Sequence, residues 1–191
     1  MAATMLTGEQ SADLAAWRTL ALRRMPYLAS VLFALRPVAC DELPTIAVDA
    51  QWRLYVNFGW AAGCTPDFMG QALCHEAGHL LADHARFATP AGVTPAQAVQ
   101  WNIAADCAWN DDLRDAGCTE LTDAGFLPGD IGAADHLTPQ AYFRHLQANP
   151  PTATGDRSGT LPDPGCGSGS GGTPIPGELG GAGRLTGTAK V

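Results

Sequence analysis

The feature that most constrains the fold is the pentapeptide His-Glu-Ala-Gly-His at residues 75–79, within the mostly apolar stretch QALCHEAGHLLADH. Residues four apart in an α-helix are separated by roughly 40° around the axis and by one turn along it. His75 and His79 would therefore lie on one face, where two imidazoles can bind one metal ion at about 2 Å. Glu76 would lie beside His75, within reach of a water that the metal activates. The segment predicts a helix that carries a metal site.

The HExxH pattern of this segment is typical of zinc metallopeptidases, although it also arises by chance in helices that bind no metal. Two neighbouring features favour the metal site. Residues 72–73 and 80–81 are apolar, so the helix is expected to be buried and its polar face needs a purpose. Gly78 is unfavourable inside a helix, which indicates the close approach of another backbone or of a substrate. We therefore predict that the two histidines bind Zn²⁺ and that the glutamate acts as general base.

Three residues compete for the position of third ligand, since a catalytic zinc site usually has three protein ligands. His84 would point away from the site unless the helix ends early, and Asp83 is better interpreted as an exposed charge near the helix end. Asp106 belongs to the next predicted helix, WNIAADCAWNDDL, which can pack across the first. We predict Asp106 as the third ligand and keep His84 as the alternative. Asn102 and Asn110, one turn on either side of Asp106, could orient the ligands.

The spacing of apolar residues predicts a mostly helical domain. Spacings of three and four indicate helices over residues 8–35 with a break at Pro26, 66–87, 95–116 and 139–147. Pro37 is expected to end the first helical region, and a loop rich in Gly and Asp precedes the last helix. Alternating apolar residues predict a β-hairpin over 45–58, just before the HExxH helix. We expect an α+β domain over residues 8–148, with a small antiparallel hairpin beside that helix.

The composition changes near the end of the chain. Residues 151–191 contain 12 of the 22 glycines and no aromatic residue. Such a segment buries too little apolar surface to offset the entropy lost on ordering. Residues 149–191 are therefore expected to be a flexible tail, a linker to a C-terminal domain outside this sequence.

The net charge of −8 argues against a nucleic-acid partner, which requires a basic face, and against an anionic membrane surface. No window offers the roughly 20 apolar residues of a membrane-spanning helix, and the first residues do not resemble a signal peptide. Residues 101–135 hold eight acidic residues and one arginine, either as a solvated acidic face or, for some of them, as ligands of a cation.

The cysteines indicate the compartment. They contain no CxxC pair, and reduced thiols are expected in a chain of this size without an export signal. We therefore expect a cytoplasmic protein with six free thiols, at Cys40, Cys64, Cys74, Cys107, Cys118 and Cys166.

Several segments taken together resemble one known family. In chain order they are PYLASVLFAL, LYVNF, HEAGHLLADH, WNIAADCAWNDDL, a loop containing LP, and TPQAYFRHL, within about residues 20–148. They resemble the DUF2201 N-terminal family of bacterial metallopeptidase domains, usually followed by a von Willebrand A-like domain. The resemblance implies a zincin-like fold and zinc peptidase activity. It assigns His75, Glu76 and His79 to the HExxH core, His84 to a trailing histidine and Asp106 to the aspartate of the second helix.

Two functions are compatible with these residues. The first is a zinc-dependent endopeptidase that binds an extended peptide along the edge of the hairpin. The second is a non-catalytic, zinc-stabilised adaptor that works with a MoxR-type AAA+ ATPase. Glu76 favours the enzyme, because a structural zinc site needs no general base and usually has four protein ligands.

Overall fold

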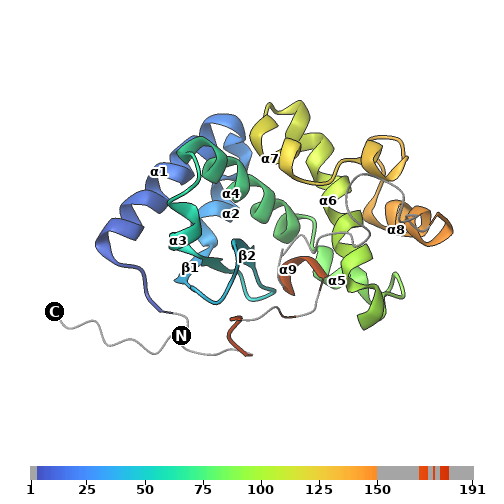
Figure 1. Cartoon of the computed structure of the whole chain (residues 1–191), viewed down its shortest axis with the longest axis horizontal. Helices are drawn as coiled ribbons and strands as arrows, with labels where there is room; N and C mark the ends of the chain where they lie inside the picture. The colour runs from blue at the N-terminus through green and yellow to red at the C-terminus, as the bar shows by residue number, and fades with distance from the viewer. Residues whose placement is uncertain (1–3, 150–167, 172–173, 175–176, 181–191) are drawn as a thin grey trace.

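The computed structural model describes residues 4–149, 168–171, 174 and 177–180. Figure 1 shows a mostly helical molecule with a small sheet, which agrees with the predicted α+β class. The elements in chain order are α1 (Gly8–Arg24), η1 (Pro26–Leu28), α2 (Ala29–Ala34), β1 (Arg36–Ala39), β2 (Ile46–Val48), β3 (Arg53–Val56), α3 (Phe58–Ala61), α4 (Pro66–Leu81), α5 (His84–Ala88), η2 (Pro95–Gln97), α6 (Ala98–Asp115), α7 (Thr119–Ala124), η3 (Pro128–Ile131), α8 (Pro139–Ala148) and α9 (Ser168–Gly171).

The sheet has three strands in the order β1-β3-β2. β2 and β3 form the predicted antiparallel hairpin, but β1 pairs with β3 in parallel, so the sheet is mixed rather than antiparallel throughout. Pro37 lies within β1 instead of simply ending a helix. A proline is tolerated there because β1 is an edge strand and its missing N–H breaks no inner ladder. β3 ends at Val56, earlier than expected, because Asn57 caps α3 by accepting the Trp60 N–H.

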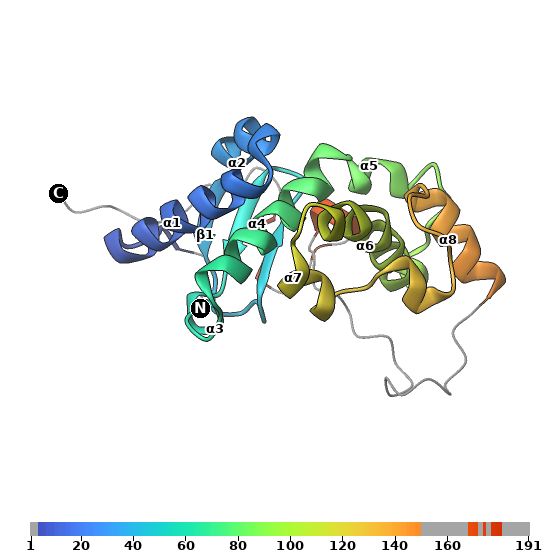
Figure 2. The same ribbon diagram turned by 90° about the horizontal axis from the view of Figure 1, so that it is seen from above.

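α4 is the central helix of the fold. Thr65 caps it by accepting the Phe68 N–H, with Pro66 in the first turn. All residues from Met69 to Leu80 are buried. In Figure 2, α4 lies between the N-terminal helices α1 and α2 on one side and α6 and α8 on the other. The HExxH segment is therefore buried, as its apolar neighbours predict.

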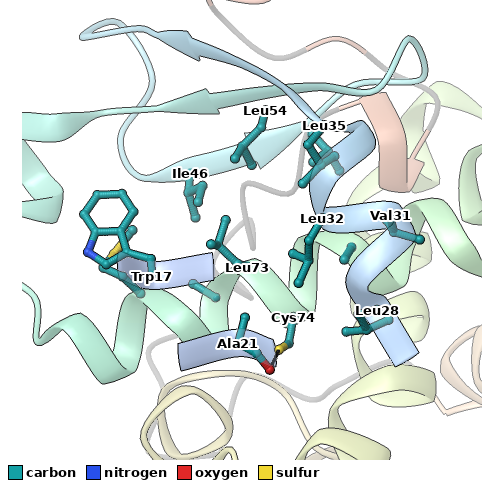
Figure 3. Close-up of a cluster of buried hydrophobic side chains, with 14 of the residues drawn as sticks. Trp17, Ala21, Leu28, Val31, Leu32, Leu35, Ile46, Leu54, Leu73 and Cys74 are labelled. Atoms are coloured by element: carbon teal, nitrogen blue, oxygen red, sulfur yellow. Dashed lines mark hydrogen bonds between the residues drawn. The ribbon is translucent and has the colours of Figure 1, made fainter. Parts of the chain in front are cut away.

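The main hydrophobic core fills the space between α1, α2, α4 and one face of the sheet. Figure 3 shows side chains from all four parts in this cluster, among them Trp17, Ala21, Leu32, Ile46, Leu54 and Leu73. α1 and α4 approach closely at Gly70, where a Cβ would lie 2.8 Å from the Leu20 Cβ. A second cluster joins α6 to α8, where the rings of Trp101 and Phe143 meet edge to face with their centroids 5.6 Å apart. The two cores hold α4 and α6 in fixed positions.

The helix predicted over residues 66–87 is interrupted. α4 ends at Leu81, and α5 begins at His84 after Asp83 adopts left-handed backbone angles, with φ of 53°. Asp tolerates this conformation better than most residues because its short side chain bonds locally. The loop predicted before the last helix also contains structure, namely α7 and η3. The break at Pro26 and the last helix, which Thr138 caps, are confirmed.

Parts of the segment expected to be a flexible tail pack against the domain. α9 lies between β2, α4, α5 and α6. Trp101 Nε1–H donates to the Ser170 carbonyl at 3.1 Å, and a Cβ at Gly169 would lie 2.9 Å from the Val48 carbonyl oxygen. Leu179 covers the outer face of the sheet, where its N–H donates to the Tyr55 hydroxyl oxygen at 3.0 Å. Residues 168–171 and 177–180 thus differ from the expectation, and the rest of the predicted tail lies outside the described residues.

Two expectations concern the surroundings of the protein. The five described cysteines are free thiols, and Cys166 lies outside the described residues. Within the described part of the chain, no helix combines the length and the apolar character needed to cross a membrane.

Candidate metal centre

Three side chains from two helices converge on one point. α4 contributes His75 and His79, and α6 contributes Asp106, each at most 8% exposed. The two Nε2 atoms lie 2.9 Å apart. Asp106 Oδ1 lies 3.2 Å from His79 Nε2 and 3.5 Å from His75 Nε2. The structure therefore brings together the three residues predicted as ligands, and they form a candidate His/Asp metal site.

The spacing of these atoms fits a metal ion. Ligand atoms bound tetrahedrally at about 2.0–2.1 Å lie about 3.3 Å from one another. The three distances, from 2.9 to 3.5 Å, bracket that value. Two imidazole nitrogens and a carboxylate oxygen can all act as acceptors, and atoms this close in a buried space share either a proton or a cation. The residues present thus suit a divalent cation.

The orientation of His75 is fixed through Asn110. His75 Nδ1 lies 2.8 Å from Asn110 Oδ1. The amide cannot face the other way, because Asn110 Nδ2 donates to the Phe126 carbonyl at 2.9 Å. His75 Nδ1 must then carry the proton, so its Nε2 presents a lone pair to the site. The expectation that Asn110 orients a ligand matches this geometry, whereas Asn102 accepts from the Ser170 hydroxyl at 3.2 Å.

His84 contacts the ring of His79 on the side away from the other two candidate ligands. Its Nδ1 lies 2.8 Å from His79 Nδ1, on the side of the ring opposite the other two ligand residues. His79 Nδ1–H donates to His84 when His79 Nε2 keeps its lone pair for a cation. His84 reaches this place because the left-handed Asp83 turns the chain, while Asp83 itself is half exposed and pairs with Arg86. The geometry therefore gives His84 the place of a partner to a ligand rather than of a third ligand.

Burial keeps the histidines of the site neutral. It lowers the pKa of His75 to about 4, helped by the neighbouring His79, and lowers the pKa of His79 to about 3. Burial, with the charges of the other two rings, lowers the pKa of His84 to about 2. Neutral imidazole is the form that binds a metal. The site is thus ready for a cation at neutral pH.

Glu76 differs from its neighbours. It is 2% exposed, and its Oε2 has no hydrogen-bond partner among the described residues. Burial, together with the negative charge of Asp106, raises its pKa well above the usual value, while a hydrogen bond from the Val48 N–H acts in the opposite direction. A buried carboxyl with one unpartnered oxygen is costly for stability, so the side chain is better explained by a function at this site.

Gly78 allows α4 and α6 to approach. A Cβ at this position would lie 2.0 Å from Trp109 Nε1 and 2.1 Å from its Cε2. The indole N–H donates to the Cys74 carbonyl at 3.1 Å, so the pyrrole part of the ring lies against α4. The predicted close approach at Gly78 is therefore made by a side chain of α6 rather than by a backbone or a substrate.

The site opens into a cavity of about 410 Å³. The cavity is polar at one end, where the lining residues are His75, Glu76, Asp106 and Asn110. The remaining lining is mostly apolar and comes from β2, α3, α4, α7 and the residues after α7: Thr45, Ile46, Trp60, Phe68, Ala72, Leu121, Ala124, Gly125 and Phe126. A molecule in the cavity would therefore meet the ligands and the unpartnered Glu76 together.

A second group of possible ligands lies between the end of α6 and the loop before α8. It consists of Asp111, Asp112 and His136, and two of the three are exposed. Asp111 already accepts the His136 backbone N–H at 2.5 Å and the Tyr142 hydroxyl at 3.4 Å. These bonds account for its burial, so this group is a structural connection between α6 and the loop before α8.

Comparison with known proteins identifies one match. A family model described as "Putative metallopeptidase domain" matches residues 9–172. This is the DUF2201 N-terminal family that the sequence motifs resemble, and the match extends through α9. No curated protein and no solved structure matches significantly.

Proposed function

Since the chain belongs to this metallopeptidase-domain family, we propose that it is a zinc-dependent peptidase. In this proposal His75, His79 and Asp106 hold Zn²⁺, and Glu76 is the general base. Two imidazoles and one carboxylate are a common protein ligand set of catalytic zinc, which keeps a fourth position for water or substrate. The family implies a metal ion, and the donor set supports zinc among the divalent metals.

One observation carries the proposal. Glu76 Oε2 is buried without a hydrogen-bond partner among the described residues, and Glu76 lines the same cavity as two of the three candidate ligands. A site that only stabilised the fold would gain from filling this position with an apolar or bonded side chain. An unpartnered carboxylate beside a metal site can accept and return a proton, as a general base does in peptide hydrolysis.

The chemistry divides between the metal and the chain. Bound zinc would supply Lewis acidity, which polarises a peptide carbonyl and acidifies a water. Glu76 would accept the proton of the attacking water at Oε2 and deliver it to the leaving amine. The Val48 N–H holds the carboxyl in place, and Asn110 and His84 hold the two imidazoles. Each of these contacts reduces the movement needed to reach the transition state.

The edge of β2 supports binding of an extended peptide. The Thr45 carbonyl and the Asp49 N–H bond across to β3, so the backbone groups of Ile46 and Val48 face the outer edge. That edge lies beside the site, because Ile46 lines the cavity and Val48 bonds Glu76. The Val48 N–H is already donated to Glu76 and its carbonyl lies against Gly169 of α9, so a substrate strand would pair at Ile46, next to the general base. The reduced cysteines support a reducing compartment, and we propose the cytoplasm.

The proposal is tested with Glu76→Gln, which keeps the size of the side chain but cannot accept a proton. Zinc content, measured by mass spectrometry of the metal, should stay near one per chain. Cleavage of an unfolded protein substrate should fall by roughly 10² to 10⁴, the contribution of a general base. Glu9→Gln, at an exposed position on α1, is the matched control and should leave cleavage unchanged.

Other outcomes lead to different functions. If Glu76→Gln loses zinc, the carboxyl is structural and the catalytic assignment is wrong. If wild-type protein binds zinc but cleaves nothing, while both forms recover a MoxR-type AAA+ ATPase, the zinc-stabilised adaptor replaces the enzyme.

A further inference from the structure

We infer that the cavity beside the metal centre selects peptides by a bulky apolar side chain next to the scissile bond. This inference rests on the proposed peptidase function and adds the class of substrate. It is carried by the chemistry of the cavity wall, by its continuity with Glu76 and by its size.

The wall opposite the polar end is built from apolar side chains of separate elements. Trp60 from α3 and Phe68 from α4 meet edge to face, with ring centroids 6.1 Å apart. Ile46, Ala72 and Leu121 continue the apolar surface between β2, α4 and α7. Such a wall gains free energy from every apolar group that leaves water against it. Aromatic rings also favour contact with another ring or an aliphatic chain.

The apolar wall offers no partner for an acidic side chain. The acidic lining residues are Glu76 and Asp106, and none of the described lining residues is Lys or Arg. An acidic substrate side chain would lose its hydration and find no positive partner in this wall. The apolar wall thus disfavours acidic side chains through the cost of their desolvation as well as by favouring apolar contact.

The size and position of the cavity accommodate a bulky side chain of a bound peptide. Its volume of about 410 Å³ lies at the lower end of the range of small-molecule sites. Ala72 is one turn of α4 before Glu76, so the apolar wall begins immediately beside the general base. A peptide whose carbonyl reaches the metal ligands therefore places an adjacent side chain in the cavity.

The first experiment maps cleavage sites. Zinc-loaded wild-type protein is incubated with a proteome-derived peptide library, and new termini are identified by mass spectrometry. We expect Leu, Ile, Met, Phe or Tyr at one position next to the cleaved bond, enriched about 10-fold or more over Asp and Glu. Cleavage without such a preference would overturn the inference and leave the peptidase function intact.

A pair of variants assigns the preference to this cavity. Ala124 is exposed on α7 and lines the cavity, while the neighbouring Asp123 is exposed and does not. Ala124→Lys adds a cation at the mouth and should raise the cleavage of peptides with Glu at the selected position relative to those with Leu. Asp123→Asn changes the net charge by the same amount and should leave the ratio as in wild type. Equal shifts in both variants would show that the preference depends on overall charge rather than on the cavity.

A binding measurement separates this inference from the proposed function. Zinc-loaded Glu76→Gln protein is titrated with fluorescent peptides that differ only in one residue, Leu, Gly or Glu. We expect the Leu peptide to bind about 10- to 100-fold more tightly than the Gly peptide, the gain from burying one large aliphatic side chain, and the Glu peptide to bind most weakly. If the wild-type protein cleaves no peptide but the Glu76→Gln protein shows this order of affinities, the cavity inference is supported and the proposed peptidase function is refuted. Equal binding of the three peptides would refute the cavity.

Discussion

Gly78→Ala provides a stringent test of how the structure holds the HExxH helix. The substitution would ordinarily stabilise a helix, because alanine is favoured over glycine by about 1 kcal/mol in helix interiors. Here the new Cβ would lie 2.0–2.1 Å from two atoms of the Trp109 ring. No such contact is possible, so the indole or the whole of α6 must move.

The magnitude follows from three contributions. Relieving the overlap should cost about 1–3 kcal/mol, the usual range for an overpacked core. Displacing the indole also breaks its bond to the Cys74 carbonyl, at a cost of about 1 kcal/mol. The gain in helix propensity offsets about 1 kcal/mol. We therefore expect Gly78→Ala to lower the free energy of unfolding by about 1–3 kcal/mol.

Urea denaturation of the metal-free protein measures this change, and a double-mutant cycle assigns its cause. In a Trp109→Ala background the overlap is absent, so Gly78→Ala should be neutral or stabilising by up to about 1 kcal/mol. The coupling energy should exceed 1 kcal/mol. Stabilisation by Gly78→Ala alone, or additive effects in the cycle, would refute the packing of Trp109 against α4.

Three further predictions concern the metal centre. Asn110→Ala should weaken zinc affinity about 10- to 100-fold, because the His75 imidazole would lose the hydrogen bond that orients it. Competition with a chromogenic chelator measures this change. Asp106→Ala should weaken zinc more than His84→Ala does, and the reverse order would make His84 a ligand. For the metal-free protein, burial holds the pKa of the three site histidines between about 2 and about 4, below the about 6.5 of an unfolded chain. The unfolded state then binds more protons between about pH 4 and 6.5, so stability should rise with pH there by up to about 1.4 kcal/mol per unit for each histidine. The raised pKa of Glu76 lowers stability as pH rises and so offsets the contribution of one histidine. A net fall in the free energy of unfolding with rising pH, measured by urea titrations, would contradict this prediction.

The local features of the fold were predictable from the sequence because they depend on neighbouring residues. Pro26 interrupts the first helical region, Thr138 caps the last helix, and the alternation of apolar residues marks the β2–β3 hairpin. The pairing of Asp106 with the HExxH helix was also predicted, since its helix has a polar face that suits the site. Asp106 and Asn110 lie on the same face of α6 because they are four residues apart.

Features that depend on distant contacts were not predicted. β1 forms because Arg36–Ala39 finds a parallel partner in β3, which no local pattern indicates. The left-handed backbone angles of Asp83 change the direction of the chain. The spacing of apolar residues continues across Asp83, so it does not indicate this break. Composition suggested that residues near 170 could not pack, but their glycines permit close backbone contact and their polar groups are bonded to Trp101 and Asn102.

The position of α9 has a consequence for biosynthesis. The candidate ligands are complete once α6 ends at Asp115, whereas α9 ends at Gly171. Ribosomes add about 5–20 residues per second, so several seconds separate the emergence of the two helices. During that interval Val48 and Asn102 are not yet covered by α9, and α6 gains its packing partner α8 only after a further 33 residues, at Ala148. The candidate ligands are therefore all present in the nascent chain before α9 covers this side of the site.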